Sequence, residues 1–149
     1  MKLLLLTLAL GTTAAFAPVH ETDCPFCKVP VTQNTEDQDN EVVLKFGNKK
    51  IEYSCIACVF KDQGRYKGDL VVYAPSETVG EPVILKRTEG KWSAPEKAVF
   101  INAWKEHKDC ARLSRAFSKL EAFEVYAKKH APEAKPLTLA EFEKEVAKK

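Results

Sequence analysis

The stretch VVLKFGNKKIEYSCIACVFKD (residues 42–62) decides the fold of the first half of the chain. Val42–Phe46 and Lys50–Tyr53 are rich in β-branched and aromatic residues, which favour strands. Gly47 and Asn48 lie between these two runs, and this pair is a typical hairpin signal. The sequence therefore predicts an antiparallel hairpin over these residues.

A helix is predicted directly after the hairpin, followed by a third strand. Ile56, Val59 and Phe60 are spaced as on one face of a helix, and Gly64 is a typical helix stop. The run Leu70–Tyr73 then has the composition of a strand. The predicted order in this half is strand, strand, helix, strand.

The second half of the chain is predicted to repeat this order. Pro82–Lys86, Ala98–Ile101 and Ala111–Phe117 are strand candidates, and Lys135–Leu139 is a last short strand or the beginning of a final helix. We therefore predict an α+β protein with two small tandem strand–strand–helix–strand modules and a C-terminal helix.

Two capping boxes mark the starts of the helices expected in this half. Ser118 with Glu121, and Thr138 with Glu141, each place a hydroxyl residue three positions before a glutamate. Pro132 is expected to stop the first of these two helices.

The first seventeen residues differ from the rest of the chain. MKLLLLTLALGTTAAFA (residues 1–17) has a positive start, a short apolar run and small residues before a potential cleavage site, which predicts a secretory signal peptide. We expect an exported protein, periplasmic or secreted, that meets a membrane only through this segment if it is retained. The remaining chain divides into predicted modules at residues 18–75 and 76–149. The formal net charge of +2 gives no basic surface for nucleic-acid binding.

Two C-x-x-C pairs carry the strongest chemical signal. Cys24 and Cys27 lie near the predicted mature start, and Cys55 and Cys58 lie at the start of the predicted helix. Two intervening residues let a tight turn direct both sulfurs at one point, and two such turns can complete a four-thiolate site for zinc. A helix N-terminus also favours thiolate over thiol. We therefore predict that these four cysteines bind a soft metal ion, Cu(I) or Zn(II).

Other uses of these cysteines stay open at this point. Cys24-Pro25-Phe26-Cys27 resembles a thioredoxin-type redox motif, although no long helix is expected to follow it. In an exported protein the pairs could also be local disulfides, or they could hold a structural zinc in an interaction module. No motif of nucleophilic catalysis or phosphate binding is seen, so we expect coordination rather than an enzyme.

Three further residues are weaker ligand candidates. His107 and Cys110 are three positions apart and could share a ligand set, although an exposed histidine beside a packed cysteine is the commoner arrangement. His20 precedes the first pair by four residues and could reach the same site. The roles of His107 and Cys110 are left open by the sequence.

The chain resembles the nitrous oxide reductase accessory protein (NosL-like) family over most of residues 24–146. The resemblance rests on the first C-x-x-C, on EYSCIACVFKD, on LVVYAP, on GKWSAPEKAVFINAW and on AFSKLEAFEVYAKKH followed by PLTLAEFEKEV. The first region also resembles the small TRASH and YHS metal-binding modules. In this chain Lys28 and Val29 stand where family members commonly carry a methionine.

The resemblance implies two small strand–strand–helix–strand modules, export from the cytoplasm, and delivery or sequestration of Cu(I). The metal-site cysteines of the family correspond to Cys24 and Cys27, and its strand-to-helix cysteine region corresponds to Cys55 and Cys58. Such a protein would be a metallochaperone or accessory protein with a recipient metalloprotein as its partner.

Overall fold

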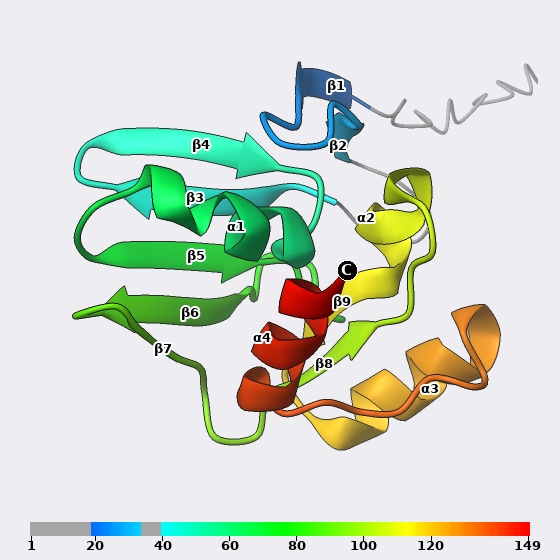
Figure 1. Ribbon diagram of the computed structural model, residues 1–149. Helices are drawn as coiled ribbons and strands as arrows, with labels where there is room; N and C mark the ends of the chain where they lie inside the picture. Colours follow the sequence, from blue (N-terminus) through cyan, green and yellow to red (C-terminus); the bar gives the residue numbers. More distant parts are fainter. Residues whose placement is uncertain (1–18, 34–39) are drawn as a thin grey trace, which may run out of the picture.

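The computed structural model describes residues 19–33 and 40–149 (Figure 1). The predicted signal peptide, residues 1–17, lies outside the described residues. Strands and helices are mixed along the chain, which ends in a helix, so the α+β class is confirmed. Within the described ranges, no helix is long and apolar enough to cross a membrane.

The largest sheet is antiparallel and has the strand order β4-β3-β5-β6-β7. Its strands are β3 (Val42–Phe46), β4 (Lys49–Tyr53), β5 (Leu70–Ala74), β6 (Val83–Thr88) and β7 (Lys91–Ser93).

The predicted hairpin is confirmed by the pairing of β3 with β4. Phe46 pairs with Lys49, so the loop contains only Gly47 and Asn48. Gly47 has a φ of +56°, a left-handed conformation that glycine adopts without steric cost. The turn therefore requires a residue that the sequence supplies, and this fixes the register of the two strands.

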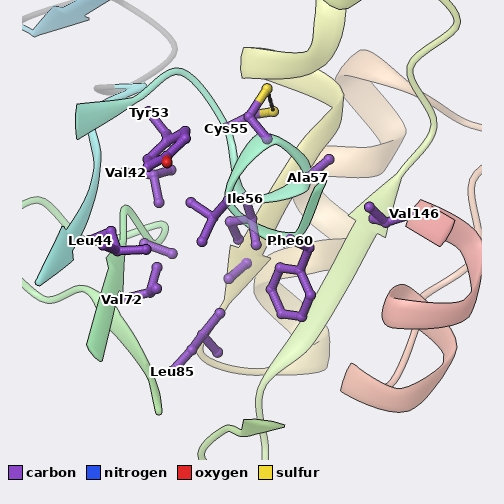
Figure 2. Close-up of a cluster of buried hydrophobic side chains, with 14 of the residues drawn as sticks. Val42, Leu44, Tyr53, Cys55, Ile56, Ala57, Phe60, Val72, Leu85 and Val146 are labelled. Carbon is purple, nitrogen blue, oxygen red and sulfur yellow. Dashed lines mark hydrogen bonds between the residues drawn. The ribbon is translucent and has the colours of Figure 1, made fainter. Parts of the chain in front are cut away.

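Among the described residues, helices cover only one face of this sheet. Leu44, Val72 and Leu85 point into the core from three neighbouring strands and are fully buried, whereas Lys45 and Lys86 are exposed on alternate positions. This alternation follows from the two-residue period of a strand. It defines the face on which helix α1 packs (Figure 2).

Helix α1 (Ile56–Asp62) is apolar almost all round, which is typical of a helix buried on every side. Ile56 to Phe60 are all buried, and Figure 2 shows Ile56 and Phe60 directed into the cluster of core side chains. Helix α4 (Leu139–Lys148) and strand β9 (Ser114–Phe117) pack against α1 as well. A short 3-10 turn, η1 (Gln63–Arg65), continues the chain toward β5.

A second hairpin, β8 (Val99–Asn102) with β9 (Ser114–Phe117), is buried on both faces. Phe100 packs in the main core with Phe142 of α4. The next residue, Ile101, points the other way into a smaller cluster under α3 (Leu120–His130). The hairpin therefore separates the two apolar clusters of the described residues.

The two halves of the chain share a strand arrangement. In the first half, β3 lies between β4 and β5, and α1 connects those two strands. In the second half, β8 lies between β9 and a bridge at Leu137, which exchanges both backbone hydrogen bonds with Phe100 at 2.9 and 3.0 Å. Strands β6 and β7 extend the first sheet beyond residue 75, so this sheet takes strands from both sides of the predicted module boundary.

The prediction of a strand over Ala111–Phe117 is wrong in its first part. Cys110–Leu113 forms one helical turn, α2, and β9 begins only at Ser114. Ala, Arg and Leu are good helix formers, and the pairing with β8 uses only the last four residues of the segment. A 3-10 turn, η2 (His107–Asp109), precedes α2.

The predicted capping box at Ser118 is also wrong. Helix α3 begins at Leu120 with Lys119 as its N-cap, and no side chain caps it. The Ser118 hydroxyl instead donates a hydrogen bond to the Glu77 carboxylate, and the Ser118 backbone N–H donates to the same group at 3.0 Å. A hydrogen bond to a charged carboxylate is stronger than one to a neutral backbone group. This explains why the Ser118 hydroxyl binds Glu77 instead of capping α3.

The capping box of α4 is confirmed, and it gives a stability prediction. Thr138 accepts from the backbone N–H of Glu141, whose carboxylate accepts from the Thr138 backbone N–H at 2.8 Å. Thr138→Ala is expected to lower the free energy of unfolding by about 1 kcal/mol, because one helix N–H loses its acceptor. Urea denaturation measures this change. Thr138→Ser retains the hydroxyl and should unfold at nearly the wild-type urea concentration; equal losses in both variants would contradict the capping role.

Candidate metal centre

Three segments that are distant in sequence meet at one end of the molecule. They are the turn between β1 (Val19–Asp23) and β2 (Pro30–Gln33), the junction of β4 with α1, and the η2–α2 segment, which Figure 1 shows near one another. Together they carry all five cysteines of the chain and His107. The side chains of these six residues converge into one cluster, which we name the thiol cluster.

The first segment is a tight turn in a small hairpin, β1 (Val19–Asp23) with β2 (Pro30–Gln33). The Cys24 backbone accepts from the Lys28 N–H and donates to the Val29 carbonyl, both at 3.0 Å. Lys28 has a φ of +63°, which is uncommon for a residue other than glycine. This turn brings the thiols of Cys24 and Cys27 into hydrogen-bonding contact.

The second segment places Cys55 and Cys58 at the start of α1. Cys55 is the N-cap residue, with an extended backbone, and Cys58 lies in the first turn of the helix. The two Sγ atoms are 3.4 Å apart, and the dashed line in Figure 2 marks this contact from Cys55. A disulfide requires about 2.05 Å between its sulfurs, so the two side chains are separate thiols. All five cysteines lie in the described residues, and each is a free thiol.

The third segment adds His107 and Cys110. Cys110 is fully buried at the start of α2, and its side chain is directed into the thiol cluster. The His107 ring stacks on Trp104 with 4.6 Å between ring centroids, and Phe26 contacts it edge-on at 5.7 Å. These two aromatic contacts hold the imidazole in place.

Four ligand atoms of the cluster lie within 4.8 Å of one another, and they could hold a metal ion. Bonds of about 2.3 Å place the sulfurs of a tetrahedral thiolate site about 3.8 Å apart, so this grouping has the size of such a site. The residues are Cys27, Cys58, His107 and Cys110.

The imidazole of His107 provides a second, independent indication of a ligand. Its Nδ1 atom is buried and has no hydrogen-bond partner among the described residues. A buried polar atom without a partner costs free energy, and such atoms are rare in folded proteins. A metal ion bound to the imidazole would remove or offset this cost.

Ser54 lies at the centre of the cluster and is fully buried. Its hydroxyl is 3.2 Å from the sulfur of Cys27, 3.6 Å from that of Cys110 and 3.9 Å from that of Cys58. A hydroxyl can donate to a thiolate and orient it, which is the usual role of groups that surround metal ligands. No sequence pattern marks this residue, because a single serine before a C-x-x-C pair is common and has no characteristic spacing.

The structure brings all four predicted ligands into the cluster but groups them differently from the prediction. Cys27 and Cys58 belong to the group of four, whereas Cys24 contacts it through Cys27 and Cys58, and Cys55 contacts it through Cys58 and Cys110. His107 and Cys110 complete the group. The side chain of His20 lies outside the described residues.

The thiols of the cluster differ in acidity because they share hydrogen bonds. Contact with Cys110 raises the pKa of Cys27, but contacts with Cys24, Cys58 and Ser54 outweigh it and lower that pKa to about 6. Burial raises the pKa of Cys55, but contacts with Cys110 and Cys58 lower it to about 5. These contacts favour the thiolate form of both side chains.

Cys58 has the opposite tendency. Its contacts with the other four cysteines, that with Cys110 first, and its burial all raise its pKa above the usual range. The pKa of Cys110 is lowered, chiefly by its contact with Cys27. The cluster thus combines cysteines that favour the thiolate form with a central cysteine, Cys58, that favours the thiol form. Thiolates are the form that binds soft metals.

No protein-family model, curated protein or solved structure significantly matches this chain.

Proposed function

We propose that this chain is an exported protein that binds a soft metal ion, Cu(I) or Zn(II), in the thiol cluster. The observation that carries the proposal is the grouping of Cys27, Cys58, His107 and Cys110, whose ligand atoms all lie within 4.8 Å of one another. Export rests on the predicted signal segment at residues 1–17.

The donor set determines the class of metal. Three thiols and an imidazole suit soft and borderline ions, whereas Mg²⁺ and Ca²⁺ require oxygen ligands. Zn²⁺ would use all four donors in a tetrahedral arrangement. Cu(I) accepts fewer ligands, so it would leave at least one donor free.

Handover of the ion, rather than catalysis, suits the exposure of the cysteines. Cys27 is partly exposed, while the other four cysteines are at most 1% exposed. Phe26 beside it is 38% exposed and offers an apolar contact for another protein. A ligand from a recipient metalloprotein would therefore approach the ion at Cys27. The resemblance to the nitrous oxide reductase accessory proteins supports copper as the cargo.

Anaerobic titration of the reduced protein tests the proposal. We expect one ion to bind tightly at the first equivalent of Cu(I) or of Zn(II), counted by mass spectrometry under native conditions. Co²⁺ in place of Zn²⁺ should give the thiolate-to-metal absorption of a tetrahedral sulfur site. Failure of the freshly reduced protein to bind either metal would refute the proposed function.

A matched variant tests the role of His107. His107→Phe keeps an aromatic ring against Trp104 but removes the nitrogen donor. We expect Zn²⁺ binding to weaken by about 10–100-fold or more, since loss of groups that only surround metal ligands already has that effect. Cu(I) affinity should fall less, because three thiolates remain. Unchanged Zn²⁺ affinity would exclude His107 as a ligand.

Thiol–disulfide exchange is the second candidate function. It is favoured by the partial exposure of Cys27 next to Cys24 and by the 3.4 Å separation of the Cys55 and Cys58 sulfurs. Thiol counting on protein isolated from its own compartment distinguishes the two functions. A reversible population of disulfides, with weak metal binding, would favour the redox function.

A further inference from the structure

The thiol cluster contains more donors than one ion requires. A tetrahedral ion takes four ligands, and the group of four already supplies them. Cys24 and Cys55 remain, and both are buried, at 0% and 1% exposure. Both lie in hydrogen-bonding contact with Cys58, so they are part of the same cluster.

Pairwise contacts among the five sulfurs form three triads. One consists of Cys27, Cys58 and Cys110. The other two together include all five sulfurs and share one member. The thiols of Cys24, Cys27 and Cys58 contact one another pairwise. The thiols of Cys55, Cys58 and Cys110 do so as well. Cys58 is the common member, and it contacts each of the other four cysteines.

A triad of thiolates is a suitable site for Cu(I), which commonly takes three sulfur ligands. Two separate trigonal ions would need six donors. If one thiolate bridges the two ions, five donors suffice, and the chain has five cysteines. Sharing a bridge also lowers the number of negative charges that must be buried together, which reduces the desolvation cost.

We infer that the thiol cluster binds two Cu(I) ions, one in the Cys24–Cys27–Cys58 triad and one in the Cys55–Cys58–Cys110 triad, with the Cys58 thiolate as the bridge between them. This inference rests on the proposed function and adds its stoichiometry. Each ion enters as Cu(I) and displaces thiol protons to solvent, so no electron is transferred. Zn²⁺ needs four donors per ion, and the cluster should hold only one.

Metal counting tests the inference directly. The reduced wild-type protein is titrated anaerobically with Cu(I) in the presence of a competing Cu(I) chelator, and the ions per chain are read by native mass spectrometry. We expect two Cu(I) per chain and one Zn²⁺ per chain. A thiolate-bridged pair shielded from water should also give orange-red luminescence and a short copper–copper distance in X-ray absorption spectra.

Two cysteine variants locate the ions. Cys24→Ser disrupts only the first triad and Cys55→Ser only the second, so each should retain one Cu(I) and lose the luminescence. Cys58→Ser removes the bridge and should lose the pair. Circular dichroism checks that each variant is folded. If a variant does not fold, the number of Cu(I) ions bound by the wild-type chain still tests the inference.

The outcomes separate this inference from the proposed function. Saturation of the wild-type protein at one Cu(I) would overturn the two-ion cluster and leave the proposed function intact. Two ions bound without luminescence and without a copper–copper distance would overturn the bridge. No binding of either metal would refute the proposed function itself.

Discussion

Cys58→Ser is expected to weaken the binding of the first metal ion by at least about a hundred-fold, because groups that merely surround metal ligands already contribute 10–100-fold. Cys58 belongs to the group of four ligands and contacts every other cysteine. Serine has nearly the same shape, but its hydroxyl is a poor ligand for soft metals. Competition against a chelator of known affinity, with one equivalent of Zn²⁺ or Cu(I), measures the change.

Cys24→Ser is the matched control for this prediction. It makes the same replacement at a residue that is also fully buried but lies outside the group of four ligands. Zn²⁺ should therefore bind to it more tightly than to Cys58→Ser, with at most the loss of about 10–100-fold that a group surrounding metal ligands contributes. Equal losses of the first ion in the two variants would contradict the assignment of Cys58 as a principal ligand and favour a set centred on the first C-x-x-C pair.

Phe142→Ala is expected to lower the free energy of unfolding of the metal-free protein by about 3–5 kcal/mol. Phe142 is fully buried on α4 and lies against Phe60 of α1 and Phe100 of β8, with ring centroids 5.4 and 5.3 Å away. Its removal leaves a cavity where the helix, the sheet core and the second hairpin meet. Such a loss is large beside the usual stability of a domain.

Urea denaturation of the two metal-free proteins measures this effect, with the slope checked for a common unfolded state. Val125→Ala is the control, because it removes apolar atoms from a side chain that is 76% exposed on α3. It should change the stability by no more than about 0.5 kcal/mol. If Phe142→Ala lowers the free energy of unfolding by less than about 1 kcal/mol, packing of this ring does not hold α4 against the core.

Local signals were sufficient for most of the fold. The β3–β4 hairpin follows from Gly47 and Asn48 with alternating neighbours, and the start of α4 follows from the capping box at Thr138. Local signals failed where a distant group changed the outcome. Ser118 fits a capping box, but its hydroxyl binds Glu77, which lies 41 positions away in sequence. No local pattern contains that partner.

The candidate metal centre could likewise be predicted only in part from local signals. The C-x-x-C spacing by itself indicates that Cys24 with Cys27, and Cys55 with Cys58, form two close pairs, because a short turn constrains both sulfurs of a pair. The spacing could not predict which of these cysteines belong to the group of four ligand atoms, because this depends on how the β1–β2 hairpin packs against α1. The spacing also gave no reason to prefer Cys110 or His107 over ordinary packed residues.

The sequence by itself therefore determined the α+β class, the main hairpin and the two cysteine pairs, all of which depend on neighbours within a few positions. Only the tertiary structure decided that Ser54, His107 and Cys110 join those pairs in one thiol cluster. The physical reason is that α1 is buried on every side. Its first turn must therefore meet whichever segments close that end of the core, and these come from both halves of the chain.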